Sequence, residues 1–408
     1  MFQRIRTTIR ETRGRYPSQF WLLFWGMLLN AAGGSMVWPF LTIYVRQQLD
    51  VPLTQVGLLL SVNSLAGFVG MSFAGPAADR FGRKGVMVLS LAAGAVGMLA
   101  MSRAASYSAW VAIMLFTGAF NPLYRVGADA MVADLVGPAE RPGAYALLRM
   151  IANLGVAIGP ALGGFITSVS YAIAFYISAL ASTGYALLLA FRARETLPAS
   201  APEAPQTGRG YAPVLRDRPF VAFVGIYGLA GMAYVMMMVL LPVYAKENFG
   251  VPESQYGFIM ATNAAMVVLF QYAVTRRTSR RAALPVLAVG SLFFAAGVGA
   301  VALSSAFLGF WLSMVVLTIG EMIVIPTSTT LTANLAPADM RGRYMGIYTI
   351  AWGMAFGIGP VLGGALNDNI GPAAIWYGAA LLAAAAAVGF LILRRERRLQ
   401  GAQPAPAT

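Results

Sequence analysis

One carboxylate stands in the middle of a long apolar stretch of the chain. Glu321 lies near the centre of residues 307–333, between Thr318 and Pro326. About 13 residues separate it from one end of the stretch, roughly 20 Å along a helix that rises 1.5 Å per residue. No Lys or Arg stands three or four residues away, so a charged carboxylate here would be costly. We expect Glu321 to face a wet cavity and carry a proton; the alternative is a neutral carboxyl that is hydrogen-bonded between helices.

Other reactive groups are missing from the sequence. The chain has no His and no Cys, which excludes imidazole bases, thiol chemistry, disulfides and Cys/His zinc sites. It also lacks the G-x-x-x-x-G-K-[ST] pattern of an ATP-binding loop. We therefore expect no catalytic residue, no metal and no cofactor. The chain is not expected to be an enzyme, and its energy source would be a gradient.

The composition places most of the chain in lipid. Of its 408 residues, 58% are hydrophobic and 11% are charged, whereas soluble domains carry about 25% charged residues. A membrane helix needs about 20 apolar residues, and twelve stretches supply them. The expected spans are residues 20–45, 55–75, 85–102, 107–133, 144–169, 171–192, 220–244, 255–275, 284–303, 307–333, 345–366 and 373–393. The expected fold class is all-α integral membrane, with twelve transmembrane helices in two six-helix bundles.

Positively charged residues orient these spans. With the amino terminus inside, the segments on that side hold 24 of the 29 Lys and Arg, and the outer loops hold only Arg46, Arg103 and Lys246. This asymmetry follows the positive-inside rule. We expect a multi-pass protein of the cell inner (plasma) membrane with both termini in the cytoplasm. The formal charge of +14 then has a topological meaning, so no nucleic-acid partner is expected.

The two halves of the chain match at an offset of 200 residues. Tyr44 and Pro52 recur as Tyr244 and Pro252, and residues 158–164 recur at 358–364 with one difference. We expect residues 1–192 and 220–408 to form the two bundles, joined by a proline-rich cytoplasmic linker over 193–219. Parallel repeats suit two bundles that rock around a shared central site. A duplicated channel or membrane enzyme would show the same repeat.

A basic turn follows the second span. It reads Gly75-Pro-Ala-Ala-Asp79-Arg80-Phe-Gly82-Arg83-Lys84. Read by itself, it is a cytoplasmic loop that obeys the positive-inside rule. The turn nevertheless resembles, almost position for position, the signature loop of the major facilitator superfamily, and it departs only at Ala77, where that family usually has Leu. The resemblance extends over the whole chain through the twelve spans, the parallel halves and the central linker.

The resemblance implies a gate on the cytoplasmic side. In that family the acid matching Asp79 faces the amino end of the eleventh span, where a helix dipole favours negative charge, and the arginine matching Arg83 approaches an acid matching Asp134. The implied gate therefore consists of Asp79, Arg80, Arg83 and Asp134. The second copy of the loop, residues 275–284, keeps the basic residues but has no acid, so the gate would be one-sided.

The fifth span carries glycines at a spacing of four residues. Gly155, Gly159, Gly163 and Gly164, together with Pro160, lie in one run. Such glycines share a helix face and allow close packing. The run also resembles the motif of the antiporter branch, the drug/proton exporters, which favours efflux over uptake. The stretch around Glu321 is similar to the tenth helix of some of these antiporters, in which the acid serves coupling or cationic substrates.

Three charges lie within the fourth and fifth spans. Arg125 and Asp129 are four residues apart and can pair on one helix face, and Arg149 lies at a similar depth in the next span. They either snorkel to the inner interface or take part in gating. The family often has an arginine earlier in the fourth span, near Met114 of this chain, and coupling schemes that depend on it do not transfer.

Polar, aromatic and Met residues in the spans could line a cavity. Asn121 is the partner of Glu321 at the offset of 200, and we expect the two to face each other. Met side chains adapt to varied shapes, and one acid among apolar walls suits lipophilic substrates, cations among them. The expected cavity residues are Asn30, Trp38, Phe120, Asn121, Tyr234, Met238, Asn263 and Trp352.

These expectations combine into one functional hypothesis. We expect a monomeric secondary transporter that exports lipophilic or amphipathic small molecules, cations among them, in exchange for protons by alternating access. Its partners would be the small-molecule substrate, protons and the lipid bilayer. One alternative is an uptake or lipid-translocating carrier on the same fold. Another is a membrane enzyme or a sensor that does not transport, although no polar catalytic cluster supports an enzyme.

Overall fold

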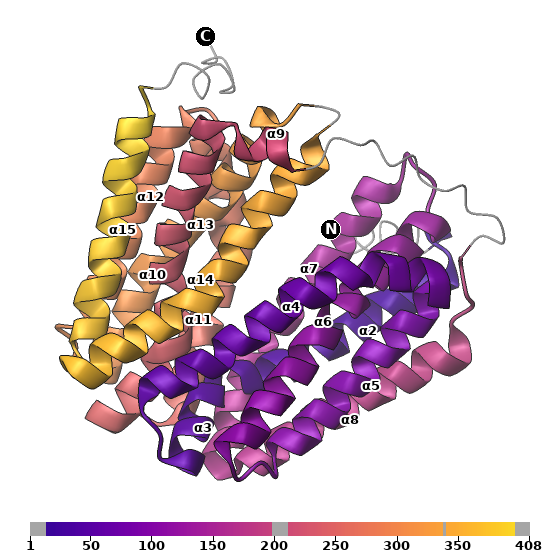
Figure 1. Ribbon diagram of the computed structural model, residues 1–408, viewed down its shortest axis with the longest axis horizontal. Coiled ribbons are helices and arrows are strands. Elements are labelled where there is room, and N and C mark those ends of the chain that lie inside the picture. The colour runs from indigo at the N-terminus through magenta and orange to yellow at the C-terminus, as the bar shows by residue number, and fades with distance from the viewer. Residues whose placement is uncertain (1–13, 198–210, 338–339, 396–408) are drawn as a thin grey trace, which may run out of the picture. The chain divides into compact units, whose positions relative to one another are not determined.

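The computed structural model describes residues 14–197, 211–337 and 340–395, and every regular element in these ranges is a helix (Figure 1). The charge assignments for Arg4, Arg6, Arg10, Arg13, Arg209, Arg397 and Arg398, and the linker residues 198–210, lie outside these ranges. The helices are α2 (Ser18–Val37), η1 (Trp38–Phe40), α3 (Leu41–Leu49), α4 (Leu53–Phe81), α5 (Arg83–Met101), α6 (Tyr107–Leu135), α7 (Arg141–Val169), α8 (Tyr171–Arg192), α9 (Ala212–Leu215), α10 (Arg218–Phe249), α11 (Glu253–Thr278), α12 (Ala283–Val301), α13 (Phe307–Leu335), α14 (Arg341–Asn369) and α15 (Ala374–Leu393).

Each of the twelve expected spans lies on helix, which confirms the all-α membrane fold class. Within the described ranges, eleven helical segments are long and apolar enough to cross a bilayer. The remaining expected span is α6, a helix of 29 residues. The first span is divided: α2 and α3 are separated by the short η1, which contains Pro39. Proline has no amide hydrogen and fixes its backbone, so a regular α-helix does not run through it unchanged.

The linker was expected to extend over residues 193–219, but it ends before Arg218, where α10 begins. It includes α9. The Asp217 side chain accepts a hydrogen bond from the Phe220 amide (3.4 Å), which caps the start of α10. Pro219 then occupies the first turn, where a proline costs no intrahelical hydrogen bond. Proline therefore marked a helix start here rather than linker.

The chain forms two compact units. Unit 1 consists of residues 1–38 and 65–204, and unit 2 of residues 39–64 and 205–408. The end of the first span and the beginning of α4 thus belong to the same unit as the second half of the sequence. The assignment of residues 1–192 and 220–408 to two separate bundles stays a prediction.

The helix bounds follow the internal repeat. Three helices of unit 1, α5, α6 and α7, begin 200 residues before α12, α13 and α14 of unit 2, and end at the same offset. Each pair therefore has the same length and the same start. Residues 200 apart occupy the same turn of matching helices, so they can be compared one by one.

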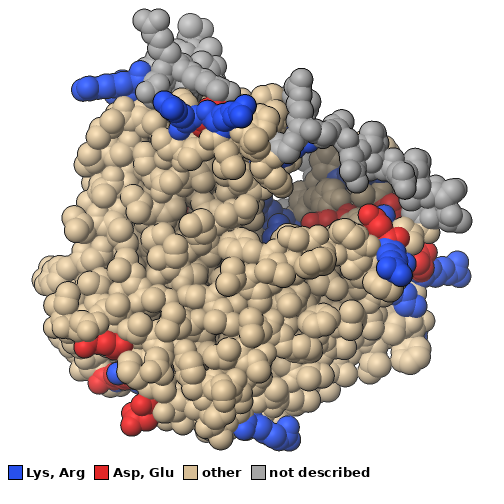
Figure 2. All heavy atoms as spheres, in the orientation of Figure 1, with Lys and Arg blue, Asp and Glu red and all other residues tan. Residues whose placement is uncertain are grey.

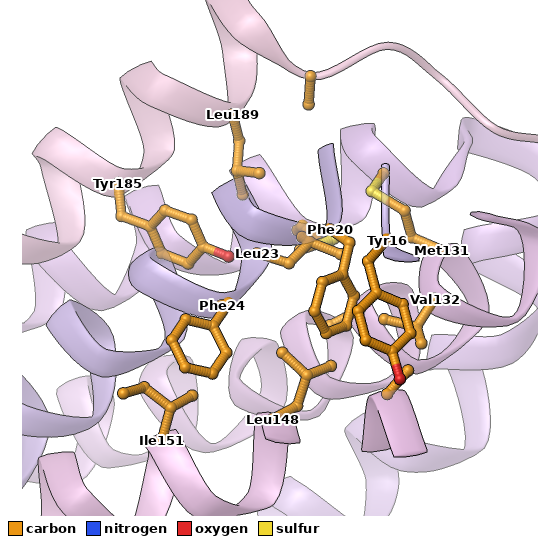
Figure 3. Packing of buried hydrophobic residues seen from close by; sticks show 14 of the residues in the cluster. Tyr16, Phe20, Leu23, Phe24, Met131, Val132, Leu148, Ile151, Tyr185 and Leu189 are labelled. Carbon is orange, nitrogen blue, oxygen red and sulfur yellow. The ribbon is translucent and has the colours of Figure 1, made fainter. Parts of the chain in front are cut away.

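Unit 1 has a core in which α2 packs against α6, α7 and α8 (Figure 3). Phe20 and Tyr185 are completely buried there, with Phe24, Met131 and Leu148 around them. The glycines of α7 lie against the α2 backbone: a Cβ on Gly155 would come within 2.9 Å of the Ala32 nitrogen. Close backbone approach of this kind is how small residues hold helices together in lipid.

The molecular surface is mostly uncharged. Figure 2 shows Lys, Arg, Asp and Glu gathered in a few clusters on the drawn face, with wide uncharged areas between them. Large apolar side chains such as Phe73, Val169 and Leu180 are exposed. A soluble protein would not expose so many, whereas contact with the hydrocarbon core of a bilayer accounts for them.

Candidate functional site

The Glu321 carboxylate is held by an amide from a neighbouring helix. Asn263 of α11 donates from Nδ2 to Glu321 Oε2 on α13 (2.7 Å), and the same nitrogen lies 2.9 Å from Thr318 Oγ1. Asn263 is 9% exposed and Thr318 is fully buried, whereas Glu321 keeps partial exposure. Among the described residues, no Lys or Arg forms an ion pair with Glu321. The carboxylate is thus positioned by neutral groups and can exchange a proton without breaking a salt bridge.

Aromatic side chains of α10 and α14 surround this carboxylate within unit 2. Tyr234 lies within hydrogen-bonding reach of the Glu321 carboxyl. Its ring centroid is 5.5 Å from Trp352 and 5.7 Å from Phe294. The structure therefore brings two of the expected cavity residues, Asn263 and Tyr234, to Glu321, and a third, Trp352, lies against Tyr234. Met238 lies one turn after Tyr234 and is partly buried.

A chain of hydroxyl groups extends from this cluster, and the sequence analysis missed it. Tyr348 donates to Tyr227 (O···O 3.0 Å), and its oxygen lies 2.9 Å from Ser328 Oγ. The Tyr227 and Tyr348 rings stack with centroids 4.7 Å apart, and the Trp352 ring lies 6.1 Å from Tyr227. Tyr348 and Trp352 are four residues apart on α14 and so share a helix face. That spacing was the signal in the sequence from which Tyr348 could have been predicted beside Trp352.

The expected cavity residues of the first half lie around a pocket in unit 1. Asn30 and Trp38, and Asn121 of α6, line a cavity of about 140 Å³ together with residues of α5 and α8. Phe120 does not line it: its ring lies 4.9 Å from Phe116, and its carbonyl accepts from Ser90 Oγ (2.8 Å). That Asn121 and Glu321 face each other stays a prediction, because they belong to different units.

The signature loop forms a compact charge cluster in unit 1. Arg83 Nη1 lies 2.6 Å from Asp79 Oδ1 and donates to the Ala78 carbonyl (2.9 Å). Arg83 Nε is 3.5 Å from Asp134 Oδ2, an ion pair without hydrogen-bond geometry. Arg80 is turned away, with its guanidinium 5.5 Å above the Phe81 ring. Arg83 thus joins α4, α5 and α6, the contact with Asp134 that the resemblance implies; a gating role stays a prediction.

A second acid, which the sequence analysis did not single out, holds the same loop. Glu195, which follows α8, accepts from the Arg83 amide (Oε1, 2.9 Å) and the Lys84 amide (Oε2, 3.1 Å) at the amino end of α5. Burial alone would raise the pKa of Glu195, but backbone amide hydrogens from Leu197, Thr196, Arg83 and Lys84 together hold that pKa below its usual value. A carboxylate at this place also matches the helix dipole.

Gly82 makes this contact possible. Its φ of +86° is unfavourable for a residue with a side chain, and a Cβ there would overlap the Glu195 carboxylate. Thr196 extends the cluster by donating from Oγ1 to Asp134 Oδ2 (3.0 Å). The start of the linker is therefore attached to the loop cluster at two places: Glu195 binds the amino end of α5, and Thr196 binds Asp134.

The three charged residues expected within the fourth and fifth spans, Arg125, Asp129 and Arg149, are exposed. Arg125 Nε and Asp129 Oδ2 are 3.9 Å apart, with 83% and 54% of the side chains exposed, so the expected pair forms but is weak. Arg149 is exposed as well. The glycine run of α7 is a packing surface for α2, and Gly159, Pro160, Gly163 and Gly164 are all buried. Whether these residues also serve antiport stays a prediction.

Glu195 and the helix-start amides that it binds form a contact that we call a clasp, and a second clasp lies in unit 2. Asp368, near the end of α14, accepts from the Leu53 amide (3.2 Å), the Thr54 amide (2.8 Å) and Thr54 Oγ1 (2.6 Å) at the start of α4. Arg46 Nε lies 2.7 Å from Glu247 Oε1. Gly57 fits closely against α14, since a Cβ there would come within 2.7 Å of the Pro360 oxygen. These contacts hold residues 39–64 to the second half of the chain.

A larger, apolar groove lies on unit 1. It has a volume of about 1170 Å³ and is lined by residues of α2, α7 and α8 that include Trp21, Trp25 and Ile158. None of the expected cavity residues lines it. Trp25 is 60% exposed there, as expected of a surface that lipid chains cover.

Comparison with known proteins identifies the family. The family model of the Major Facilitator Superfamily matches residues 23–353 and, in a second alignment, residues 223–407. The chain therefore belongs to the Major Facilitator Superfamily and is a multi-span membrane transporter, which confirms the resemblance seen in its signature loop. The two matches begin 200 residues apart, the offset of the internal repeat.

Curated relatives are similar over most of their length. The multidrug resistance protein MdtH of Klebsiella pneumoniae (strain 342) is 29% identical over 372 residues, which cover 88% of this chain and 89% of the relative. The Na(+), Li(+), K(+)/H(+) antiporter of Planococcus maritimus is 28% identical over 361 residues, covering 80% and 84%. This chain is similar to both over at least 80% of its length.

Solved structures of low sequence identity share the fold. The crystal structure of the nucleoside transporter NupG has a TM-score of 0.73 at 14% identity and covers 93% of this chain and 100% of that chain. A bacterial homologue of the human lysosomal transporter Spinster has a TM-score of 0.74 at 15% identity, covering 95% and 98%. These similarities confirm the expected fold class.

Proposed function

We propose that this transporter exports lipophilic or amphipathic small molecules, cations among them, in exchange for protons. The observation that carries the proposal is the Glu321 carboxyl on α13, bound to the amide of Asn263 (2.7 Å) and adjoined by Tyr234, which packs against Trp352. A carboxyl that is partly exposed and has no basic partner among the described residues can take up and release a proton. Aromatic walls bind apolar and cationic groups.

Glu321 would couple substrate export to proton entry because the same carboxyl binds either the substrate or a proton. In the charged state it attracts a cationic or polar part of the substrate from the cytoplasmic side. A proton that enters from outside neutralises the carboxyl, and the attraction is lost, so the substrate leaves outward. Asn263 Nδ2 can donate to the carboxyl oxygen in both states, so Glu321 keeps its position during the exchange.

Alternating access also requires contacts that break and re-form. On the cytoplasmic side we assign this role to Asp79, Arg83 and Asp134, whose ion pairs are partly exposed and therefore not expensive to break. On the outer side the Asp368–Thr54 hydrogen bonds are the candidates. The protein would work as a monomer in the plasma membrane with both termini in the cytoplasm.

The names of the relatives support this class of function. One is a multidrug resistance protein and another exchanges alkali cations for protons. Both names fit an exporter, and one fits proton exchange. They differ in the substrate, so Na⁺ and K⁺ belong in the test beside lipophilic cations.

The test uses purified full-length protein in sealed proteoliposomes that contain a pH-sensitive dye. A proton gradient is imposed, and tetraphenylphosphonium, ethidium, Na⁺ or K⁺ is added to wild type, Glu321→Gln and Glu140→Gln. Glu140 forms an exposed ion pair with Arg15, far from Glu321 in the sequence, and serves as a matched control. We expect substrate-triggered proton flux in wild type and Glu140→Gln, and none in Glu321→Gln.

Two results would contradict the proposal. Unchanged proton flux in Glu321→Gln would remove Glu321 from the coupling. Substrate movement without proton flux in any of the three proteins would favour a facilitator, an uptake carrier or a lipid carrier. Flux with Na⁺ or K⁺ alone would keep the coupling and replace the proposed substrate class.

A further inference from the structure

The pocket of unit 1 exists because two glycines stand where the second repeat carries aromatic rings. Gly34 and Gly94 line it, and a Cβ added to either would meet nothing within 4 Å. Their partners at the offset of 200 are Tyr234 and Phe294, whose rings are in contact (centroids 5.7 Å apart). The same place is therefore filled by side chains in unit 2 and left open in unit 1.

The wall of this pocket carries hydroxyl and amide groups but no charge. Its lining consists of Asn30, Gly34, Trp38, Ser90, Leu91, Gly94, Met98, Met101, Thr117, Asn121, Tyr124, Ser178 and Ser182. A cation or an anion would find no counter-charge here, and moving it out of water would be expensive. A neutral group that forms hydrogen bonds is the chemistry that fits.

One hydroxyl in the pocket has no hydrogen-bond partner among the described residues. Ser178 of α8 is fully buried, and its Oγ forms no hydrogen bond. By contrast, Ser90 Oγ donates to the Phe120 carbonyl (2.8 Å), and Thr117 Oγ1 donates to the Ile113 carbonyl (2.8 Å). A buried hydroxyl without a partner destabilises a protein, so its presence at a cavity wall indicates a group that binds there.

The size of the pocket limits what it can hold. A cavity of about 150 Å³ accommodates one benzene ring, whereas whole drug-sized ligands need about 300 Å³ or more. The pocket of about 140 Å³ therefore takes one end of a molecule. Asn121 is exposed and Ser178 is buried, so the pocket runs from the surface of unit 1 into its interior.

We propose that this pocket is a binding subsite for an uncharged hydrogen-bonding group, such as an amide or a hydroxyl on a ring, at one end of the transported compound. Ser178 Oγ would donate to, or accept from, that group. The subsite rests on the proposed function for its role in transport, but binding to it does not require proton coupling.

The experiment compares two matched probes in equilibrium binding to purified full-length protein in nanodiscs, followed by tryptophan fluorescence. The probes are tetraphenylphosphonium and its analogue with one para-carboxamide group. One buried hydrogen bond to the carboxamide should make the analogue bind about tenfold more tightly, which corresponds to about 1.4 kcal/mol. We expect Ser178→Ala, which changes little volume, to reduce this preference to within about twofold.

Gly94→Ala tests the volume of the pocket independently of the hydroxyl. A methyl group there enters open space, so the variant should fold and lose the preference because the pocket is smaller. Gly225→Ala is the matched control: it also meets nothing within 4 Å, but it lies on α10 outside the pocket. It should keep the tenfold preference.

The outcomes separate the subsite from the coupling hypothesis. Equal binding of the two probes by wild type, no binding of either probe, or a preference that survives both pocket variants would overturn the subsite and leave a pocket that holds only water. A preference that both pocket variants abolish would establish it. Because proton flux is not measured here, a failure of the Glu321→Gln experiment would not alter either result.

Discussion

Units 1 and 2 have three matching helices, α5, α6 and α7 in one and α12, α13 and α14 in the other, but they use their interiors differently. In unit 1, Gly34 and Gly94 leave a neutral pocket open. In unit 2, Tyr234 and Phe294 close the corresponding place, and a carboxylate, Glu321, stands where unit 1 has Asn121. A few side-chain differences between matching helices with the same bounds are therefore enough to give the two repeats different interiors.

In both units an acidic side chain also binds the backbone amides at a helix start. Glu195 accepts from the first amides of α5 in unit 1, and Asp368 accepts from those of α4 in unit 2. Each acid comes from a distant part of the chain and satisfies amides that a helix start leaves unpaired. Each therefore joins segments of one unit that are far apart in the sequence.

The largest expected effect concerns the Glu321 carboxylate site of unit 2. Asn263→Leu removes the donor 2.7 Å from Glu321, and loss of a hydrogen bond to a charged group costs about 1.5–3 kcal/mol. We expect substrate-triggered proton flux in proteoliposomes to fall at least tenfold. The matched variant Asn63→Leu, at the same position of the first repeat, also lies in unit 2 and should have a smaller effect because the residue 200 positions before Glu321 is the neutral Asn121. Equal losses in both variants would break the comparison.

The next effect compares two glycines with positive φ. Gly82→Ala in unit 1 combines an unfavourable φ of +86° with an overlap with Glu195, whereas Gly250→Ala in unit 2 has a φ of +66° and open space around it. We expect losses in the free energy of unfolding of about 2–3 kcal/mol and about 1 kcal/mol, respectively. Thermal unfolding in detergent measures both. A loss for Gly82→Ala no greater than that for Gly250→Ala would mean that Glu195 does not constrain the loop.

A smaller effect is expected at the clasp of unit 2. Asp368→Asn leaves one acceptor oxygen for the three donors of Leu53 and Thr54. We expect amide hydrogen exchange over residues 50–57 to become about tenfold faster, which corresponds to about 1.4 kcal/mol, while exchange at the start of α5 is unchanged. Mass spectrometry of peptides from both regions measures this. Unchanged exchange over 50–57 would show that Gly57 and its close packing hold the segment without the acid.

The smallest effect is a pH dependence at the clasp of unit 1. Because the pKa of Glu195 is lowered in the folded state, its contribution to stability is present above the unfolded pKa of about 4.3. That contribution is lost as the pH falls through the lower folded value. Glu195 is exposed, so we expect less than about 1 kcal/mol. Unfolding curves of wild type and Glu195→Gln between about pH 3 and 7 should converge at the acid end; curves that stay parallel would assign the stabilisation to packing.

Sequence patterns predicted the fold better than the site. The lengths of the apolar stretches and the offset of 200 residues anticipated every long helix, because a bilayer requires about 20 apolar residues in each span. Asn263 and Tyr234 were expected in a cavity and lie at Glu321, and Trp352, also expected there, packs against Tyr234. Ser178, Tyr348, Glu195 and Asp368 were missed, because each acts through a contact with a residue far away in the sequence, and no local spacing marks it.

The amino-acid sequence alone was enough to predict that the chain is helical, duplicated and embedded in lipid. These properties depend on composition and periodicity, which are local, and on a solvent that accepts only backbones whose hydrogen bonds are satisfied. The contacts between polar groups became known only from the folded structure. There the amide of Asn263 binds the carboxylate of Glu321, and the carboxylate of Glu195 binds the amides of α5. The hydroxyl of Ser178 lies at the wall of an open pocket. Such contacts depend on how helices pack, and in this protein two glycines or two aromatic rings at the same place leave a pocket or fill it.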